Sequence, residues 1–289
     1  MARVNRAVEL LAQGQPIYYT GVEDVSYEGG VKSAQTWADY LLVEMEHGVF
    51  DLVALEAFMK GLVDGGPTRS GHRTPAVVVT LPTDGTDAAV MRANAWMVKQ
   101  VLARGVHGIL LCHAESPEAV RVFVESCRYP FQTEGVGEQM GVGRRGAGGQ
   151  GWASTVWGLS SEDYLQKADP WPLNPEGELL LGLKIENRRA LANVEASVRV
   201  PGIAFAEWGP GDMSMSFGHV FHHDPPYPPE LENARARVLN ACKAADVAFL
   251  NMARPQEVIA MIGEGVRVCA GSEESAEIGR RHTGRTLSW

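Results

Sequence analysis

The chain has 289 residues, of which 45% are hydrophobic, so it can bury the core of one α/β barrel of about 250 residues or of two smaller domains. Its formal net charge of −9 argues against nucleic acid or an anionic membrane as the main partner, because the average surface would be repelled by either. We therefore expect a small-molecule ligand and one domain over residues 1–289.

The cysteine pattern and the N-terminal segment indicate a cytoplasmic protein. The four cysteines are scattered without a CxxC pair, which fits a reducing compartment better than a disulfide framework. Residues 1–16 predict a short amphipathic helix broken by Gly14 and Pro16 rather than a signal peptide. No apolar stretch approaches the roughly 20 residues of a membrane span, so we expect no membrane partner.

Eight apolar runs of strand length follow along the chain and alternate with helical segments. The predicted strands begin at Pro16, Asp39, Pro75, His107, Leu179, Gly202, Asp246 and Val266. The predicted helices cover residues 51–63, 88–105, 116–128, 188–197, 231–245 and 254–265. Continuous apolar strands joined by helices predict a parallel sheet covered on its outer face, and eight of them predict a TIM (β/α)8 barrel.

One long irregular segment, rich in glycine and tryptophan, interrupts this alternation between Gln132 and about Trp171. Its length predicts a loop insertion over the active-site mouth.

Two carboxylates stand at the ends of predicted strands. Glu186 ends the run LLLGLKIE, and Asp212 follows the run IAFAEW in the turn GPGD. Because parallel strands of a barrel end at the same rim, both side chains are expected there, where a hard divalent cation could bridge them. A helix cap and a surface ion-pair partner are the structural alternative.

Several motifs resemble the HpcH/HpaI aldolase and citrate-lyase-like family. They are DYLLVEMEHGVFD from Asp39, RYP from Arg128, GxRGxG from Gly143, KIEN from Lys184 and GPGDMS from Gly209, and they match in order over nearly the whole chain. The resemblance implies a barrel of the phosphoenolpyruvate/pyruvate-binding type, a homo-oligomer such as a trimer or hexamer, and class II aldolase chemistry on a 2-oxo acid such as pyruvate.

The resemblance also implies roles for particular residues. Glu186 and Asp212 would hold a divalent cation such as Mg²⁺, Mn²⁺ or Co²⁺, and the amides of Gly211 and Asp212 would receive the substrate carboxylate. His47, in the string EHG, would transfer a proton, with Glu44 or Glu46 orienting it. The chemistry suits these residue types, because a chelated cation withdraws enolate charge and an imidazole with a pKa near 6.5 can accept a hydroxyl proton.

The chain departs from the family pattern at three positions. Thr80 or Leu81 stands where the aldolases have an arginine, Ala103 stands where they have the aspartate that partners the histidine, and Lys184 replaces a glutamine. Lys184 points the same way as Glu186 on its strand, so its ammonium could supply the missing positive charge. A Schiff-base mechanism through Lys184 is the alternative.

Further side chains are candidates for holding the substrate. Trp208 directly precedes GPGD, Arg145 lies in the glycine-rich string, and His113 ends the fourth strand beside Cys112. Trp208, together with Trp152 and Trp157, would suit an aromatic compound that releases a small aldehyde, which is an alternative to pyruvate.

Two further sequence motifs could indicate a binding site, and one alternative function remains. GVGRRG from Gly141 satisfies GxGxxG, but it lacks the preceding strand and following helix of a nicotinamide site. The run HVFHHDPPYPP from His219 has histidines at ligand-like spacing, although its prolines favour a loop or interface. A catalytically silent relative that binds the cation without turnover is the alternative from outside the enzyme class.

Overall fold

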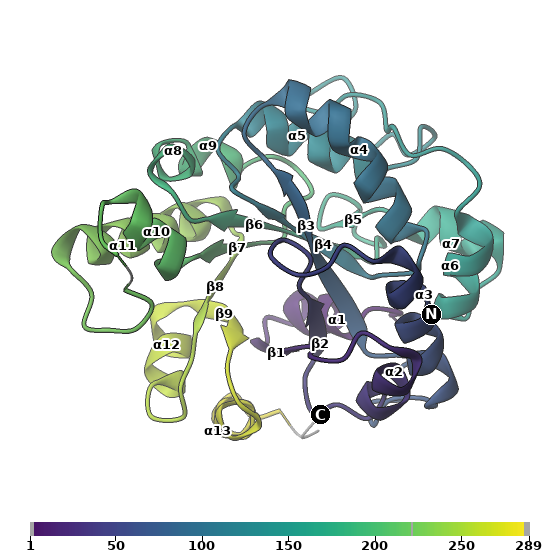
Figure 1. Cartoon of the computed structure of the whole chain (residues 1–289), viewed down its shortest axis with the longest axis horizontal. Coiled ribbons are helices and arrows are strands. Elements are labelled where there is room, and N and C mark those ends of the chain that lie inside the picture. Colours follow the sequence, from purple (N-terminus) through teal and green to yellow (C-terminus); the bar gives the residue numbers. More distant parts are fainter. Residues whose placement is uncertain (1–2, 221, 286–289) are drawn as a thin grey trace.

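Eight parallel strands close into a barrel in the computed structural model, which describes residues 3–220 and 222–285 (Figure 1). The barrel strands are β1 (Ile17–Gly21), β2 (Tyr40–Val43), β3 (Ala76–Asp84), β4 (Gly108–Cys112), β6 (Leu179–Ile185), β7 (Phe205–Trp208), β8 (Ala248–Met252) and β9 (Val266–Ala270). The ring is complete because β4 pairs with β6 and β9 pairs with β1. All eight predicted strands and the TIM barrel are confirmed.

Helices surround the barrel (Figure 1). They are α1 (Arg6–Ala12), α2 (Tyr27–Ser33), α3 (Leu52–Asp64), α4 (Ala88–Leu102), α5 (Pro117–Cys127), α6 (Gln150–Trp157), α7 (Ser161–Lys167), α8 (Arg188–Ala192), α9 (Val194–Ser197), α10 (Pro210–Ser216), α11 (Pro229–Ala245), α12 (Val258–Glu264) and α13 (Glu273–His282). The side chains of Asp51, Asp87 and Ser116 accept hydrogen bonds from the first free N–H groups of α3, α4 and α5, which explains where these helices begin. The first predicted helix started at Met1, and residues 1 and 2 lie outside the described residues.

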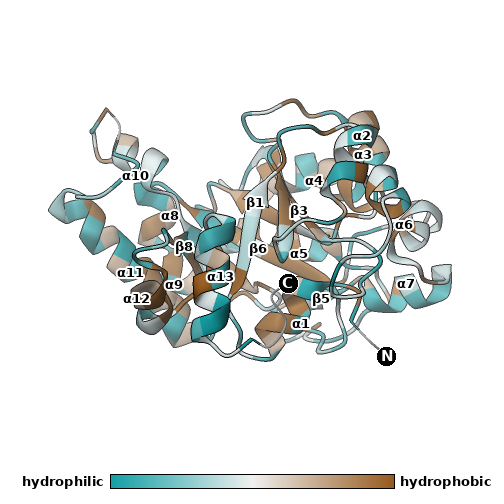
Figure 2. Ribbon diagram, turned by 90° about the horizontal axis from the view of Figure 1, so that it is seen from below, coloured by the Kyte–Doolittle hydropathy of each residue, from teal (hydrophilic) through white to brown (hydrophobic). Residues whose placement is uncertain are grey.

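The half of the barrel interior nearer the N-terminal ends of the strands, here called the lower half, is largely apolar. Inward side chains such as Tyr40, Leu180 and Phe205 form one cluster with α1, which therefore covers the N-terminal end of the barrel. A Cβ on Gly182 would lie 2.3 Å from the Phe205 ring, so only glycine leaves room for that ring. Outward side chains of the strands pack against the helices, and Figure 2 shows the apolar colouring concentrated on strands such as β3. The charged side chains of Lys184 and Glu207 stand further along β6 and β7, toward the C-terminal ends of the strands.

The segment between Gln132 and Trp171 differs from its prediction. It contains α6, α7 and a two-residue strand, β5 (Pro170–Trp171), which pairs with β6. The indole of Trp157 donates to the carbonyl of Gly105 at 2.9 Å and stacks on His107 at 5.3 Å. Both partners precede β4, so α6 lies at the N-terminal end of the barrel, opposite the C-terminal ends of the strands. The expectation of a loop over the active-site mouth is wrong for this part of the segment.

A buried ion pair anchors the inserted segment. Arg128 follows α5, and its Nε lies 2.7 Å from the carboxylate of Asp169, with both side chains fully buried. Asp169 directly precedes β5, so this pair holds the two ends of the insertion together. The anchor and Trp157 therefore hold the two ends of the insertion and α6 at the N-terminal end of the barrel, whereas residues 137–144 run along α5 and line surface cavities with Pro117 and Glu118 at its start.

A second buried cluster joins the C-terminal segment to the start of β2. The carboxylate of Asp39 accepts from Arg285 at 2.7 and 3.0 Å, from Arg280 at 3.2 Å and from the amide of Tyr18 at 2.9 Å. The Asp39 side chain is 1% exposed.

Among the described helices, none combines the length and apolar character needed to cross a membrane.

Candidate active site

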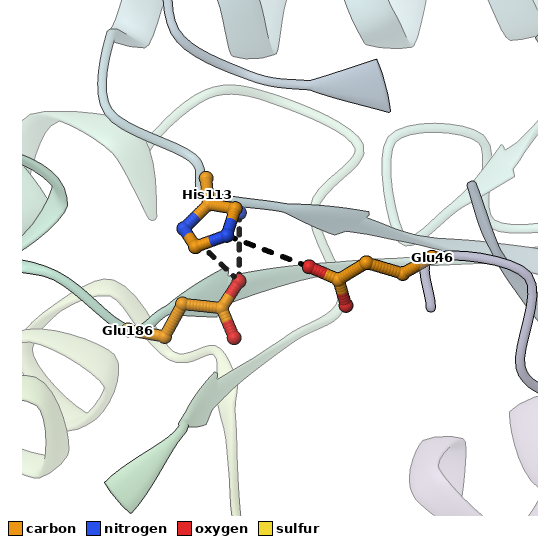
Figure 3. A group of neighbouring side chains, drawn as sticks. All are labelled: Glu46, His113 and Glu186. Atoms are coloured by element: carbon orange, nitrogen blue, oxygen red, sulfur yellow. Dashed lines mark hydrogen bonds and ion pairs between the residues drawn. The ribbon is translucent and has the colours of Figure 1, made fainter. Parts of the chain in front are cut away.

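Glu46, His113 and Glu186 meet at the C-terminal ends of β2, β4 and β6 (Figure 3). Nε2 of His113 lies 3.5 Å from Oε1 of Glu46, and Nδ1 lies 3.6 Å from Oε1 of Glu186. The two carboxylate side chains are only 5% and 1% exposed. One donor atom from each residue lies within 4.8 Å of the others, which is close enough for a group that binds a metal ion.

Lys184 lies on the other side of the two carboxylates. Its ammonium is 2.5 Å from Oε2 of Glu46 and 3.7 Å from Oε2 of Glu186. Burial acts to lower the pKa of Lys184, but the neighbouring groups Glu207, Glu186, Cys112 and Glu46 outweigh it and hold the pKa above its ordinary value. Lys184 is therefore a charged ammonium at neutral pH.

Further carboxylates surround this group. Glu207 pairs in register with Lys184 and faces the barrel interior, and Asp84 and Asp212 line the cavity above. With Glu46 and Glu186, this makes five carboxylates, and the positive charges of Lys184 and of Arg188 in the same cavity leave a formal excess of three negative charges if all are ionised. Such an excess calls for a bound cation or for protonation.

Burial and the excess of negative charge raise the pKa values of these carboxylates. Burial and the charge of Glu46, opposed by Lys184, together raise the pKa of Glu186 to about 8. Burial also raises the pKa of Glu207 and of Asp84, with the charge of Glu46 acting in the same direction on both. Oε1 of Glu46 is buried and has no hydrogen-bond partner among the described residues. The donor set and its charge therefore suit a divalent cation.

His113 is held by backbone and side-chain contacts. Its φ of +43° lies in the left-handed region, and its amide donates to Oε1 of Glu186 at 2.9 Å. Asn187 caps α8 through its side-chain oxygen, so its NH₂ group faces Nδ1 of His113 at 3.1 Å. Nδ1 is then the acceptor, and in the neutral ring the proton is on Nε2, which faces Glu46. Coordination of a metal through Nε2 would require that proton to move, so the carboxylates are the stronger candidate ligands.

Glu44 shapes the turn that carries His47. Its carboxylate accepts from the Thr80 hydroxyl at 2.7 Å, from the amide of Glu46 at 2.5 Å and from the amide of His47 at 3.2 Å. Burial acts to raise its pKa, but these hydrogen bonds outweigh burial and lower it. The His47 ring is 68% exposed on the rim, with Nε2 3.8 Å from Oε2 of Glu46. Glu44 thus positions the turn, and Glu46 rather than Glu44 contacts His113 and Lys184.

The turn before α10 brings Asp212 to the same cavity. Gly209 packs directly on Glu186, because a Cβ there would lie 2.9 Å from the Cβ of Glu186. Gly211 and Asp212 occupy the first turn of α10, where N–H groups have no helical partner. Asp212, His113 and Asn187 line a cavity of about 830 Å³ with Arg188 and Arg189.

Two predicted substrate contacts are wrong. Arg145 is 2% exposed, its guanidinium lies between the rings of Tyr129 and Tyr164 at 4.6 and 5.4 Å, and it donates to the Tyr164 hydroxyl at 2.5 Å. It belongs to the anchored insertion rather than to the cavity. Trp208 is 2% exposed and packs edge-on against Tyr227 at 5.0 Å. Since Glu207 faces the interior, its neighbour Trp208 must face the helices.

The loop from His219 is tied to its own neighbourhood. His219 contacts Glu230 at 2.7 Å, and the amide of His222 donates to Ser214 at 3.0 Å. His223 lies close enough to the mouth to lower the pKa of Glu207.

All four cysteines are buried and free of disulfides.

Sequence reasoning missed Glu207 and gave Glu46 too small a part. Strand alternation places residues 207 and 205 on one face, but both faces of β7 are buried, so the sequence alone does not show which face points inward. No local pattern places Glu46 beside Lys184, since they are 138 residues apart along the chain.

Comparison with known proteins agrees with this geometry. The sequence profile of the HpcH/HpaI aldolase/citrate lyase family matches residues 31–268. The chain belongs to this family.

Individual relatives are distant. The chain is 28% identical over 210 residues to a hydroxypyruvate/pyruvate aldolase of Deinococcus radiodurans, covering 72% of this chain and 63% of that protein. An HpcH/HpaI family structure from Burkholderia cenocepacia superposes with a TM-score of 0.72 at 22% identity, covering 97% of both chains. The citrate lyase β subunit of Mycobacterium tuberculosis, solved with oxaloacetate and magnesium, has a TM-score of 0.52 at 14% identity, covering 93% of this chain and 97% of that chain. These structures show a shared fold.

Proposed function

We propose that this protein is a carbon–carbon lyase of the aldolase type that requires a divalent cation and acts on a 2-oxo acid such as pyruvate. The observation that carries the proposal is the unbalanced group of buried carboxylates around Lys184. It lies at the C-terminal ends of the strands, where TIM-barrel enzymes place their chemistry.

Glu186 and Asp212 are the proposed ligands of the cation, and Oε1 of Glu46, which accepts no hydrogen bond among the described residues, lies beside Glu186 and His113. When bound there, a Mg²⁺, Mn²⁺ or Co²⁺ ion supplies a Lewis acid for the 2-oxo group of the substrate. Two relatives support a divalent cation and a 2-oxo acid substrate. One is named a hydroxypyruvate/pyruvate aldolase, and the other was solved with oxaloacetate and magnesium.

Lys184 and the first turn of α10 would hold the substrate. The ammonium of Lys184 offsets negative charge that develops on the substrate oxygen, in place of the arginine that this chain lacks. The free amides of Gly211 and Asp212 would receive the substrate carboxylate. Because the raised pKa keeps Lys184 protonated, a Schiff base is disfavoured.

His47 would transfer the hydroxyl proton during cleavage. Its ring is exposed on the rim beside Glu46, and an imidazole can accept a hydroxyl proton near neutral pH. His47→Ala should therefore slow turnover more than it weakens substrate binding. A change in binding alone would contradict this role.

The test is exchange of the pyruvate methyl protons with deuterated water, followed by NMR with added Mg²⁺, Mn²⁺ or Co²⁺. We expect cation-dependent exchange that is lost in Asp212→Asn. Exchange that is independent of the cation, or normal in this variant, would overturn the cation assignment. A protein that binds the cation without exchanging pyruvate would point to another carbon skeleton or to a silent relative.

Borohydride treatment in the presence of pyruvate separates the two aldolase mechanisms. We expect no reduced adduct on Lys184, and a trapped adduct found there by mass spectrometry would instead establish the Schiff-base route. Assembly into a homo-oligomer stays a prediction, which light scattering after gel filtration would check.

A further inference from the structure

Arg188 lines the acidic cavity without a carboxylate partner. It stands two residues after Glu186, at the start of α8. Among the described residues, no Asp or Glu oxygen lies within 4.0 Å of its guanidinium, whereas the neighbouring Arg189 contacts Glu115 at 3.2 Å. The two adjacent arginines of one cavity therefore differ in whether their charge is already neutralised.

The position of Arg188 is defined by two other contacts. Its amide donates to the Ser216 hydroxyl at 2.9 Å, and its guanidinium lies 5.4 Å from the centre of the Phe217 ring. Both partners belong to the end of α10, the helix that carries Asp212. The aromatic contact supports the side chain and leaves its five N–H donors for a ligand.

The cavity contains acidic side chains that do not neutralise Arg188. Asp84 and Asp212 line the same space, yet in the described part of the chain neither carboxylate lies within 4.0 Å of the Arg188 guanidinium. A substrate with one carboxylate can place it at Lys184 and the amides of α10. A second negative group would be repelled by the acidic wall unless it met an unpaired cation.

We propose that Arg188 receives a second anionic group, a carboxylate or phosphate, carried by the aldehyde partner of the 2-oxo acid. This inference rests on the proposed function, which supplies the aldehyde. The planar guanidinium binds either group through two parallel hydrogen bonds. Arg145, the residue that the sequence suggested for an anionic substrate, cannot compete because it is buried between two tyrosines.

The first experiment measures kcat/KM for aldol addition of pyruvate to matched aldehydes. Succinate semialdehyde is paired with butanal to test a carboxylate, and D-glyceraldehyde 3-phosphate is paired with D-glyceraldehyde to test a phosphate. Arg188→Gln should lower the ratio of charged to neutral aldehyde about tenfold for whichever anion the site takes. Arg189→Gln is the matched control and should leave both ratios within a factor of two, because both arginines are exposed and only the charge of Arg189 is already paired with Glu115.

The second experiment needs no turnover and therefore separates this inference from the proposed function. Calorimetry compares 2-oxoadipate, which has two carboxylates, with 2-oxohexanoate, which has one, in the presence of Mn²⁺. We expect about tenfold tighter binding of the diacid to the wild-type protein and no such preference in Arg188→Gln. This result without any aldol addition would sustain the role of Arg188 and contradict the aldolase proposal.

Three results would overturn the role of Arg188. They are equal binding of the two acids by the wild-type protein, an equal loss for charged and neutral aldehydes in Arg188→Gln, and the same effect in Arg189→Gln. Circular dichroism and thermal unfolding of both variants check that each retains the fold.

Discussion

The two ends of β2 carry buried carboxylates in opposite situations. Asp39, just before the strand, is surrounded by two guanidinium groups and an amide. Glu46, just after it, shares one ammonium with four other carboxylates and keeps one oxygen without a hydrogen-bond partner in the described chain. Both side chains are at most 5% exposed, so burial alone does not separate them.

Hydrogen bonding separates structural charge from functional charge in this barrel. A buried carboxylate that is fully hydrogen-bonded resists removal, since its partners would be left unpaired. A buried carboxylate with a free oxygen is costly to the fold by itself and is explained by a ligand that arrives later. The following predictions test this contrast, starting with the largest effect.

Glu186→Gln should lower the rate of cation-dependent pyruvate exchange at least about a hundredfold, because it removes charge from the proposed cation site. The cation-free protein should unfold at the same temperature as the wild type or higher, because repulsion among the carboxylates falls. NMR exchange and thermal unfolding with a chelator measure the two effects. A destabilised protein with normal exchange would show that Glu186 stabilises the fold, as Asp39 does, and has no role in the active site.

Asp39→Asn should lower the free energy of unfolding by about 3 kcal/mol, because two buried arginines lose their counter-charge. Urea unfolding followed by tryptophan fluorescence measures the change. Exchange activity of the fraction that remains folded should be unchanged. A loss below about 1 kcal/mol would mean that solvent replaces the carboxylate at little cost.

The cation-free protein should become less stable as pH rises from about 4.5 to 8. The pKa of Glu186 is raised from 4.5 to about 8 in the fold, so the folded state holds a proton that the unfolded state has released, and this stabilisation is lost as Glu186 ionises. Glu207 and Asp84 shift in the same direction. Unfolding midpoints measured across this range with a chelator check the slope, which Glu186→Gln should reduce. A slope unchanged in that variant would remove Glu186 as its source.

Glu44→Gln should have the smallest effect, a decrease of about threefold or less in the exchange rate with unchanged Mn²⁺ affinity. The amide oxygen can still accept from Thr80 and the turn amides, although more weakly than a carboxylate. Isothermal titration calorimetry and NMR exchange provide the two measurements. A large loss of Mn²⁺ binding would make Glu44 a ligand instead of a support for the turn.

The fold was predictable because the strands are short apolar runs with a clear boundary at each end. The predicted start of the fourth strand at His107 and the observed start of β4 at Gly108 differ by one residue. The predicted helix over residues 188–197 is divided at Asn193 into α8 and α9, a break that the apolar spacing did not reveal. One domain over residues 1–289 stays a prediction, which limited proteolysis would check.

The site was predictable only where residues follow strands. Glu186, Asp212, His113 and His47 stand at strand ends, and the structure places all four at one rim. Arg145 and Trp208 failed for different reasons. The glycine-rich string around Arg145 has no strand to give it a direction, whereas Trp208 lies on a strand whose two faces are both buried, so alternation alone does not show which face points inward. The pairing of Glu46 with Lys184 depends on barrel closure, which no local pattern records.

The apolar packing of α1 beneath the barrel leaves the interior with one entrance. Reactants and products must then share a single route, and the molecule bound deeper leaves last. The 2-oxo acid, held near Lys184, would enter first, and the aldehyde, held near Arg188, would dissociate first during cleavage. The kinetics should accordingly be ordered, with the 2-oxo acid as a competitive inhibitor of the aldol substrate and the aldehyde as a noncompetitive one.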